Sequence, residues 1–244
     1  MESSLQYLQT DLINYLDSYG IHCDEGQATL LLKHLELVIE KNKVLNLTRI
    51  TNPEEAVVLH IVDSLLPIAI PEVREKLDGR FLDMGTGAGF PGIPYGILSE
   101  APGALVDSVG KKVAAVVEFC SELGLDKLSG GHFRLEDYAT LHRGEFDVVL
   151  ARAVAQSNVL VEYASPLLSN GGILVLEKAK PEVSEINASK RAAKICGLSL
   201  VNIQEFELPN DLGHRTVIVY RKTHKPEIKL PRRNGLAKNE PLGL

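Results

Sequence analysis

A chain of 244 residues, of which 45% are hydrophobic, can bury a substantial core and fits one domain with at most an appendage. The chain does not open with a cationic segment followed by an apolar run, and its most apolar window, residues 56–70, is interrupted by His60 and Asp63, so we expect a soluble, cytoplasmic protein without a membrane span. Its three cysteines include no Cys-x-x-Cys pair, which argues against a disulfide framework and a zinc site.

The net charge of −6 is unevenly distributed along the chain. Six Lys or Arg and two Glu between Lys222 and Leu244 give this end a charge of +4, which leaves −10 for the other 221 residues. A basic tail, which we place at residues 223–244, can attract RNA phosphates even when the whole protein is acidic. A solvated, disordered end is the alternative, because residues 230–235 show no pattern for a core.

The first part of the chain shows two helical patterns. In each, apolar residues recur every three or four positions, the spacing of an amphipathic helix with one buried face. We expect residues 1–70 to form a helical extension packed on the main domain. The two stripes consist of Leu5, Leu8, Leu12 and Leu16, and of Leu31, Leu35, Val38, Ile39 and Leu45.

A third helix has a recognisable start at Asn52. The Asn52 side chain can cap the first turn, Pro53 suits the first helical position, and two glutamates follow at the positive end of the helix dipole. We expect this helix to run through His60 and Asp63 to Ser64.

From Phe81 onward, short apolar runs alternate with helical stretches. This alternation indicates β-α-β units, so we predict an α/β, Rossmann-like domain with a mostly parallel sheet over residues 71–222. Two β-rich segments, 199–207 and 216–221, should form a closing antiparallel hairpin. That ending is typical of class I S-adenosylmethionine-dependent methyltransferases, whereas NAD-binding folds end with a parallel strand. The other predicted strands are 80–84, 104–107, Phe133 with its neighbours, 146–151 and 173–177, and the predicted helices are 92–99, 111–123, 158–168 and 182–196.

A glycine-rich loop joins the first predicted strand to a helix. Its glycines are Gly85, Gly87 and Gly89, preceded by Asp83, whereas the dinucleotide fingerprint would require a third glycine at position 90, where this chain has Phe90. Glycines let a ligand lie against the backbone, and Asp83 can accept hydrogen bonds from a cationic or hydroxylated ligand. The loop therefore favours S-adenosylmethionine, which carries an ammonium group and no phosphate. A tight turn that needs glycine only for its geometry is the alternative.

Acidic residues follow the next two strands, at the edge where ligands of such sheets bind. Asp107 lies 22 residues beyond Gly85, close to the offset at which an acid contacts a ribose hydroxyl, although it could instead cap the next helix. After the third strand, Leu135 could flank an adenine and Glu136 or its neighbouring backbone could bind the adenine amine. A surface loop is the alternative for this segment.

Two basic residues follow the fourth and fifth strands. Arg152 could bind the cofactor carboxylate or a substrate phosphate, or it could form a structural ion pair. Lys178 is a weaker candidate for an anionic contact and could be a solvated strand-end charge. The Asn/Asp-Pro-Pro-Tyr/Phe motif of amino-methylating enzymes is absent after Arg152, so an exocyclic amine is not the expected nucleophile.

His60 and Asp63 lie three residues apart, on one face of the third helix, with Ser64 beside them. They could form an acid-base or metal pair, a buried hydrogen-bonded cluster, or a contact to the substrate. No third ligand has a suitable spacing, so we expect no metal site.

Taken together, these motifs resemble the glucose-inhibited division protein B family, the small-subunit 16S rRNA guanine-N7 methyltransferases. The resemblance covers nearly the whole chain and implies S-adenosylmethionine binding by Gly85, Phe90, the Leu135–Glu136 pair and Arg152. Two departures are a shortened approach to the second strand and Ala179 after Lys178, where the family usually has glycine. The shared motifs are residues 45–48, 60–64, 83–94, 106–108, 111–113, 151–153, 231–233 and 237–239.

The implied reaction needs no general base, because guanine N7 carries an in-plane lone pair. We therefore expect catalysis by placement, with His60, Asp63 and Lys178 as candidates on the substrate side and the 16S rRNA or small ribosomal subunit as partner of a monomeric enzyme. Three other functions remain open: a small-molecule methyltransferase, an NAD-dependent oxidoreductase and a non-catalytic ribosome-assembly factor.

Overall fold

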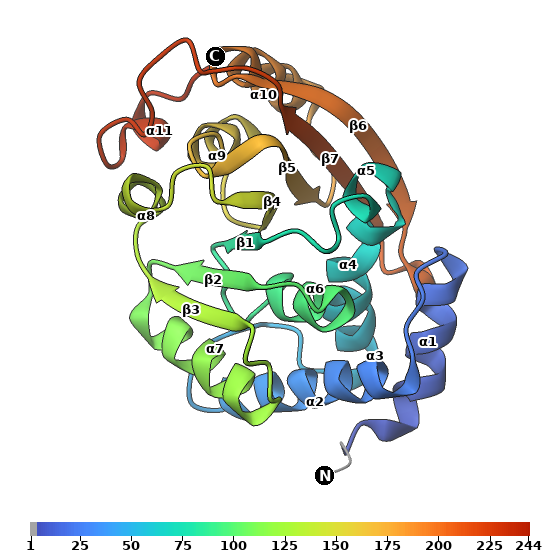
Figure 1. Ribbon diagram of the computed structural model, residues 1–244. Coiled ribbons are helices and arrows are strands. Elements are labelled where there is room, and N and C mark those ends of the chain that lie inside the picture. The colour runs from blue at the N-terminus through green and yellow to red at the C-terminus, as the bar shows by residue number, and fades with distance from the viewer. Residues whose placement is uncertain (1–3) are drawn as a thin grey trace.

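The computed structural model describes residues 4–244, and within them one mixed sheet runs through the molecule (Figure 1). Its strand order is β3-β2-β1-β4-β5-β7-β6, with parallel pairing from β3 to β5 and antiparallel pairing of β5 with β7 and of β7 with β6. The predicted fold, a parallel sheet closed by an antiparallel hairpin, is confirmed. The strands are β1 Phe81–Met84, β2 Gly103–Asp107, β3 Leu128–His132, β4 Phe146–Arg152, β5 Leu168–Lys178, β6 Leu198–Glu207 and β7 His214–Lys222.

Helices cover both faces of the sheet, and each face has its own apolar core. The first core joins the N-terminal helices, α6 and α7 to one face, and the second joins α8, α9 and α10 to the other. All three cysteines are buried and unpaired. The helices are η1 Gln6–Leu8, α1 Gln9–Ser18, α2 Glu25–Asn42, α3 Pro53–Ala56, η2 Val57–Val62, α4 Asp63–Leu65, η3 Leu66–Ala69, α5 Pro71–Arg74, α6 Gly92–Ser99, α7 Gly110–Glu122, α8 Leu135–Leu141, α9 Ser157–Ala164, α10 Val183–Ile195, η4 Pro209–Asp211 and α11 Leu236–Asn239.

The two predicted apolar stripes pack against the sheet domain, but Ile39 and Leu45 are only partly buried and Leu45 lies beyond the end of α2. Leu12, Leu16, Leu31 and Leu35 are fully buried and belong to the first core. A capping box between Asp24 and Gln27 starts α2, with both reciprocal hydrogen bonds present. None of the helices in residues 4–244 combines the length and the apolar character needed to cross a membrane.

The third helix starts as predicted but does not continue as one α-helix. Asn52 Oδ1 accepts a hydrogen bond of 2.9 Å from the Glu55 N–H, which confirms the cap. The prediction of an unbroken α-helix to Ser64 is wrong, because a π-helical segment, η2, separates α3 from α4. The wider turn changes which side chains share a face, and such segments often occur at functional sites.

The third strand was predicted too late in the chain. It ends at His132, and Phe133 lies just beyond it. Gly130 and Gly131 lie in this edge strand. Because glycine has a low β-propensity and no side chain, the segment lacks the apolar pattern by which a strand is predicted.

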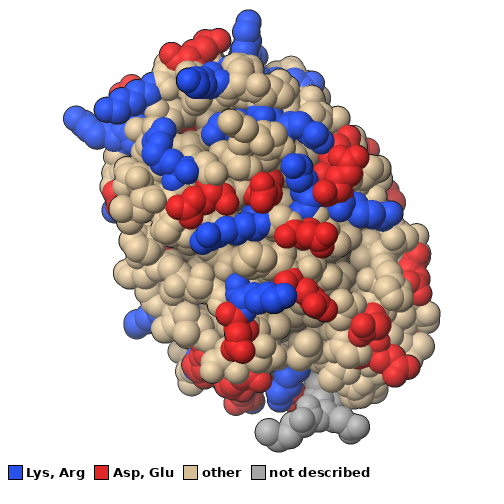
Figure 2. Space-filling view, viewed as in Figure 1, with Lys and Arg blue, Asp and Glu red and all other residues tan. Residues whose placement is uncertain are grey.

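The basic tail folds back over the second core. Leu230 and Ala237 are 3% and 1% exposed, so the tail is packed and the disordered alternative does not hold. Arg232 anchors it by donating hydrogen bonds of 2.7 and 2.6 Å to the two carboxylate oxygens of Glu162. On the face shown in Figure 2, Lys and Arg gather toward the end of the molecule where the C-terminal elements lie. The domain boundaries at residues 70 and 222 stay predictions.

Candidate active site

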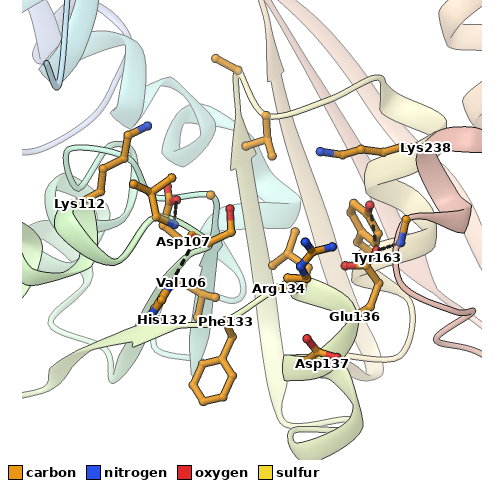
Figure 3. Close-up of a pocket in the computed structure, with 17 residues that line it drawn as sticks. Val106, Asp107, Lys112, His132, Phe133, Arg134, Glu136, Asp137, Tyr163 and Lys238 are labelled. Atoms are coloured by element: carbon orange, nitrogen blue, oxygen red, sulfur yellow. Dashed lines mark hydrogen bonds between the residues drawn. The ribbon is translucent and has the colours of Figure 1, made fainter.

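A cleft of about 740 Å³ opens at the carboxyl ends of β1, β2 and β4 (Figure 3). The glycine loop after β1 supplies Gly85 to its wall, β2 supplies Val106 and Asp107, and the loop after β4 supplies Val154. The cleft therefore lies where parallel sheets bind their ligands, as the sequence predicted.

The glycine loop has a conformation that only glycine adopts without strain. Gly85, Gly87 and Gly89 have φ values of +76°, +60° and +91°. A Cβ atom on Gly85 would come within 2.7 Å of Val154 Cγ2, on the opposite wall of the cleft. Glycine is thus required both by the backbone and by the space that it leaves.

Asp83 lies beneath this loop and is completely buried. Its Oδ2 accepts a hydrogen bond of 2.9 Å from the Gly92 N–H at the start of α6. Burial raises the pKa of Asp83 to about 6, an effect that the hydrogen bonds to the carboxylate only partly offset. The Asp83 carboxylate therefore holds the first residue of α6 in place. A contact between Asp83 and a cofactor stays a prediction.

Asp107 lines the cleft and holds the glycine loop in place. Its Oδ2 accepts a hydrogen bond of 3.1 Å from the Gly87 N–H, and its Oδ1 accepts one of 2.8 Å from the Val109 N–H. The carboxylate thus ties β1's loop to the turn before α7. Asp107 remains within reach of a ligand in the cleft, where its contact with a ribose stays a prediction.

Leu135 and Glu136 form the first turn of α8 and line the cleft. Glu136 is 8% exposed, so this segment is not the open surface loop of the alternative interpretation. Its Oε1 accepts hydrogen bonds from Tyr163 Oη at 3.3 Å and from the Gly235 N–H at 2.8 Å. Glu136 therefore connects α8 and α9 to the tail.

Several residues of the cleft were not predicted from the sequence. Tyr163 and Gly235 reach it through tertiary packing, and three cations, Lys112, Arg134 and Lys238, line it from separate elements (Figure 3). Lys112 and Lys238 stood within motifs shared with the family, residues 111–113 and 237–239, and the basic composition of the tail was a second signal for Lys238.

Phe90 packs against the N-terminal helices and does not line the cleft. Its ring is stacked on His60, with centroids 4.7 Å apart, and lies 4.5 Å from the ring of His34. His34 Nε2 donates a hydrogen bond of 3.0 Å to the Ala88 carbonyl, so this buried histidine also supports the loop. Burial lowers the pKa of both histidines to about 3, which keeps them neutral.

Arg152, at the end of β4, lies in a buried charge cluster. Its Nη1 donates to the Leu59 carbonyl at 3.2 Å and to Asp63 Oδ2 at 3.1 Å, and its Cζ lies 5.5 Å from the centroid of the Phe90 ring. Asp63 Oδ1 accepts a further hydrogen bond of 2.8 Å from Arg215 Nε. Asp63 thus bonds to two arginines. Its backbone N–H donates to the His60 carbonyl, but no side-chain hydrogen bond joins these two described residues.

Two further residues border this cluster at the end of β5. Glu177 pairs in register with Arg152 and is 3% exposed, and neither of its carboxylate oxygens has a hydrogen-bond partner among residues 4–244. Burial raises the pKa of Glu177 well above its ordinary value. Lys178 forms an ion pair of 2.8 Å with Glu185 and donates a hydrogen bond of 2.6 Å to the Ala155 carbonyl. Its contact with a substrate stays a prediction.

Comparison with known proteins identifies the family of this chain. The model of the family described as rRNA small subunit methyltransferase G matches residues 27–215. This chain belongs to that family. The methyltransferase G of Alkaliphilus metalliredigens is 37% identical over 91% of this chain and 94% of its own length, and that of Desulfitobacterium hafniense is 38% identical over 86% and 87%.

Two solved structures share the fold of this methyltransferase G family member. The Burkholderia thailandensis 1,6-didemethyltoxoflavin-N1-methyltransferase, solved with S-adenosylhomocysteine, has a TM-score of 0.54 at 14% identity, covering 77% of this chain and 88% of that one. The pre-rRNA processing protein fibrillarin of Methanococcus jannaschii has a TM-score of 0.50 at 18% identity, covering 64% and 70%. These identities are low, and the likeness concerns the fold alone.

Proposed function

We propose that this protein transfers a methyl group from S-adenosylmethionine to N7 of one guanosine in the small-subunit 16S rRNA, in the cytoplasm. The observation that carries the proposal is the glycine-walled cleft at the carboxyl ends of β1, β2 and β4 in a chain of the methyltransferase G family. The target atom, guanine N7, is implied by the resemblance of the sequence motifs to the glucose-inhibited division protein B family.

The residues of the cleft fit S-adenosylmethionine. Gly85 and Gly87 leave a cradle that a Cβ atom would obstruct or strain, and Asp107 offers carboxylate oxygens beside it. Leu135 would contact the adenine, and Arg152, next to the cleft, would bind the carboxylate of the amino-acid end. When bound, S-adenosylmethionine supplies an electrophilic methyl group on a sulfonium.

The chain's own contribution to the reaction is placement. Guanine N7 needs no deprotonation, and both histidines near the loop are neutral and occupied in packing. Correct orientation of two reactants can contribute roughly 7–11 kcal/mol to lowering a barrier. A rigid loop, fixed by Asp83 beneath it and Asp107 beside it, provides that orientation.

Charges around the cleft support an RNA substrate. Lys112, Arg134 and Lys238 form no ion pair with any residue that the structure describes. S-adenosylmethionine carries two positive groups and one carboxylate, so it does not need three additional cations. Phosphates of an RNA strand that presents an unpaired guanine would balance them.

Methyl transfer to defined RNA tests the proposal. The protein is incubated with methyl-labelled S-adenosylmethionine and unmodified small ribosomal subunits or their RNA, and borohydride–aniline cleavage then locates N7-methylguanine. We expect label at a single cleavage site, and large-subunit RNA serves as the control. Label without cleavage would reject the N7 assignment. Absence of label, despite cofactor binding, would favour a small-molecule substrate or a non-catalytic assembly factor.

A further inference from the structure

Asp63, Arg152 and Arg215, which we call the arginine clasp, join three distant parts of the chain. Asp63 belongs to α4, Arg152 ends β4 and Arg215 lies near the start of β7. Each oxygen of the Asp63 carboxylate accepts a hydrogen bond from a different arginine, at 3.1 and 2.8 Å. The side chains are only 6%, 14% and 16% exposed, respectively, so water screens these charges poorly.

The second arginine changes the charge of the clasp. A buried pair of Asp63 and Arg152 alone would be neutral and would attract an anion only weakly. With Arg215 included, two guanidinium groups and one carboxylate leave one positive charge. Burial raises the pKa of the neighbouring Glu177 carboxyl well above its ordinary value, which reduces the negative charge that it places beside the clasp.

Arg152 keeps donor groups available for a ligand. The contacts with Leu59 and Asp63 use Nη1, while Nη2 and Nε form no hydrogen bond with residues 4–244. Ala153 and Val154, which follow Arg152 directly, line the cleft. A guanidinium group held along one side can present its remaining donors to a carboxylate in a fixed orientation.

We propose that Asp63 and Arg215 are positioning residues for the carboxylate at the amino-acid end of the cofactor. Asp63 orients Arg152, and Arg215 preserves the positive charge that attracts the carboxylate. This inference rests on the proposed function, because it takes S-adenosylmethionine as the ligand.

Two ligands that differ only at the amino-acid end separate this role from a general effect on structure. S-adenosylhomocysteine carries the carboxylate, whereas methylthioadenosine shares the adenosine and the sulfur and lacks the amino-acid group. Calorimetry would compare both ligands on the unaltered protein, Arg215→Gln, Arg215→Lys and Asp63→Asn. Arg221→Gln is the matched control, because Arg221 lies on the same strand and forms its one ion pair within residues 4–244 with the exposed Glu75, at 3.9 Å.

We expect Arg215→Gln and Asp63→Asn to weaken S-adenosylhomocysteine binding roughly tenfold and to leave methylthioadenosine binding unchanged. Arg215→Lys should restore part of the affinity, and Arg221→Gln should bind both ligands normally. An equal loss for both ligands, or no loss for either, would overturn the inference. If the unaltered protein binds methylthioadenosine and S-adenosylhomocysteine equally poorly, the proposed function fails, and the inference fails with it.

Discussion

At the scale of single residues, Gly85 combines two separate requirements. Its φ of +76° disfavours any side chain, and the space beside it is occupied by Val154 across the cleft. Gly124 has a similar φ of +67° with no atom within 4 Å of a Cβ position. Substitution of both glycines would strain the backbone, but only a side chain at Gly85 would also fill space in the cleft. Comparing the two positions therefore distinguishes these effects.

Gly85→Ala should abolish measurable cofactor binding, whereas Gly124→Ala should preserve it. Both substitutions should lower the free energy of unfolding by about 1–2 kcal/mol, because both place a side chain in the left-handed region. Only the methyl group on Gly85 would meet Val154 in the cleft. Urea unfolding and calorimetry with S-adenosylhomocysteine measure the two effects, and unchanged affinity of Gly85→Ala would contradict the predicted cofactor site.

The glycine loop and the strand-end position of Arg152 could be predicted because both depend on a local pattern. The arginine clasp could not, since Arg215 and Asp63 are 152 residues apart in the chain. Phe90 shows the same difference. Its place in the glycine-loop motif could be read from the sequence, but the orientation of its ring could not, because it depends on packing against His34 and His60 from two N-terminal helices.

At the scale of elements, strands and helices with regular apolar spacing were predictable from residue patterns. The glycine-rich β3 and the π-helical segment η2 were not, because neither follows the periodicity of an ideal strand or α-helix. The tail was harder still, since its few apolar residues become buried only when it packs on the second core. Its anchor is the pair between Arg232 and the 3% exposed Glu162.

Arg232→Gln should destabilise the protein by about 3 kcal/mol, because it leaves the Glu162 carboxylate buried without its charge partner. The adjacent Arg233 is exposed and has no ion pair with the described residues, so Arg233→Gln should stay within about 0.5 kcal/mol of the unaltered protein. Urea unfolding measures both variants. Equal stability of the two would show that the tail does not depend on this anchor.

At the scale of the whole molecule, buried ionisable groups make stability depend on pH with opposite signs. The native state keeps His34 and His60 neutral down to a pKa of about 3, while the unfolded chain takes up protons below pH 6.5. The contribution of these two histidines to the free energy of unfolding therefore decreases as the pH falls from 6.5 toward 3. Asp83, with a pKa raised from 3.8 to about 6, works in the other direction and favours the folded state at lower pH.

His34→Gln should reduce the loss of stability on acidification. Glutamine can still donate to the Ala88 carbonyl but takes up no proton on unfolding, so the slope of the free energy of unfolding should decrease by up to about 1.4 kcal/mol per pH unit. Urea unfolding between pH 4 and 7 gives this slope. His22→Gln, at an exposed ring, should follow the unaltered protein. Parallel curves for His34→Gln and the unaltered protein would contradict the neutral state of His34.

The burial of all three cysteines has a practical consequence for following the cleft in solution. Burial raises the thiol pKa of Cys23 and Cys196 to about 12 and that of Cys120 to about 11, so the reactive thiolate is scarce at neutral pH. A Lys238→Cys variant would therefore offer one accessible thiol at the cleft without removal of the native ones. A fluorophore attached there would report ligand arrival in real time on an otherwise unlabelled enzyme.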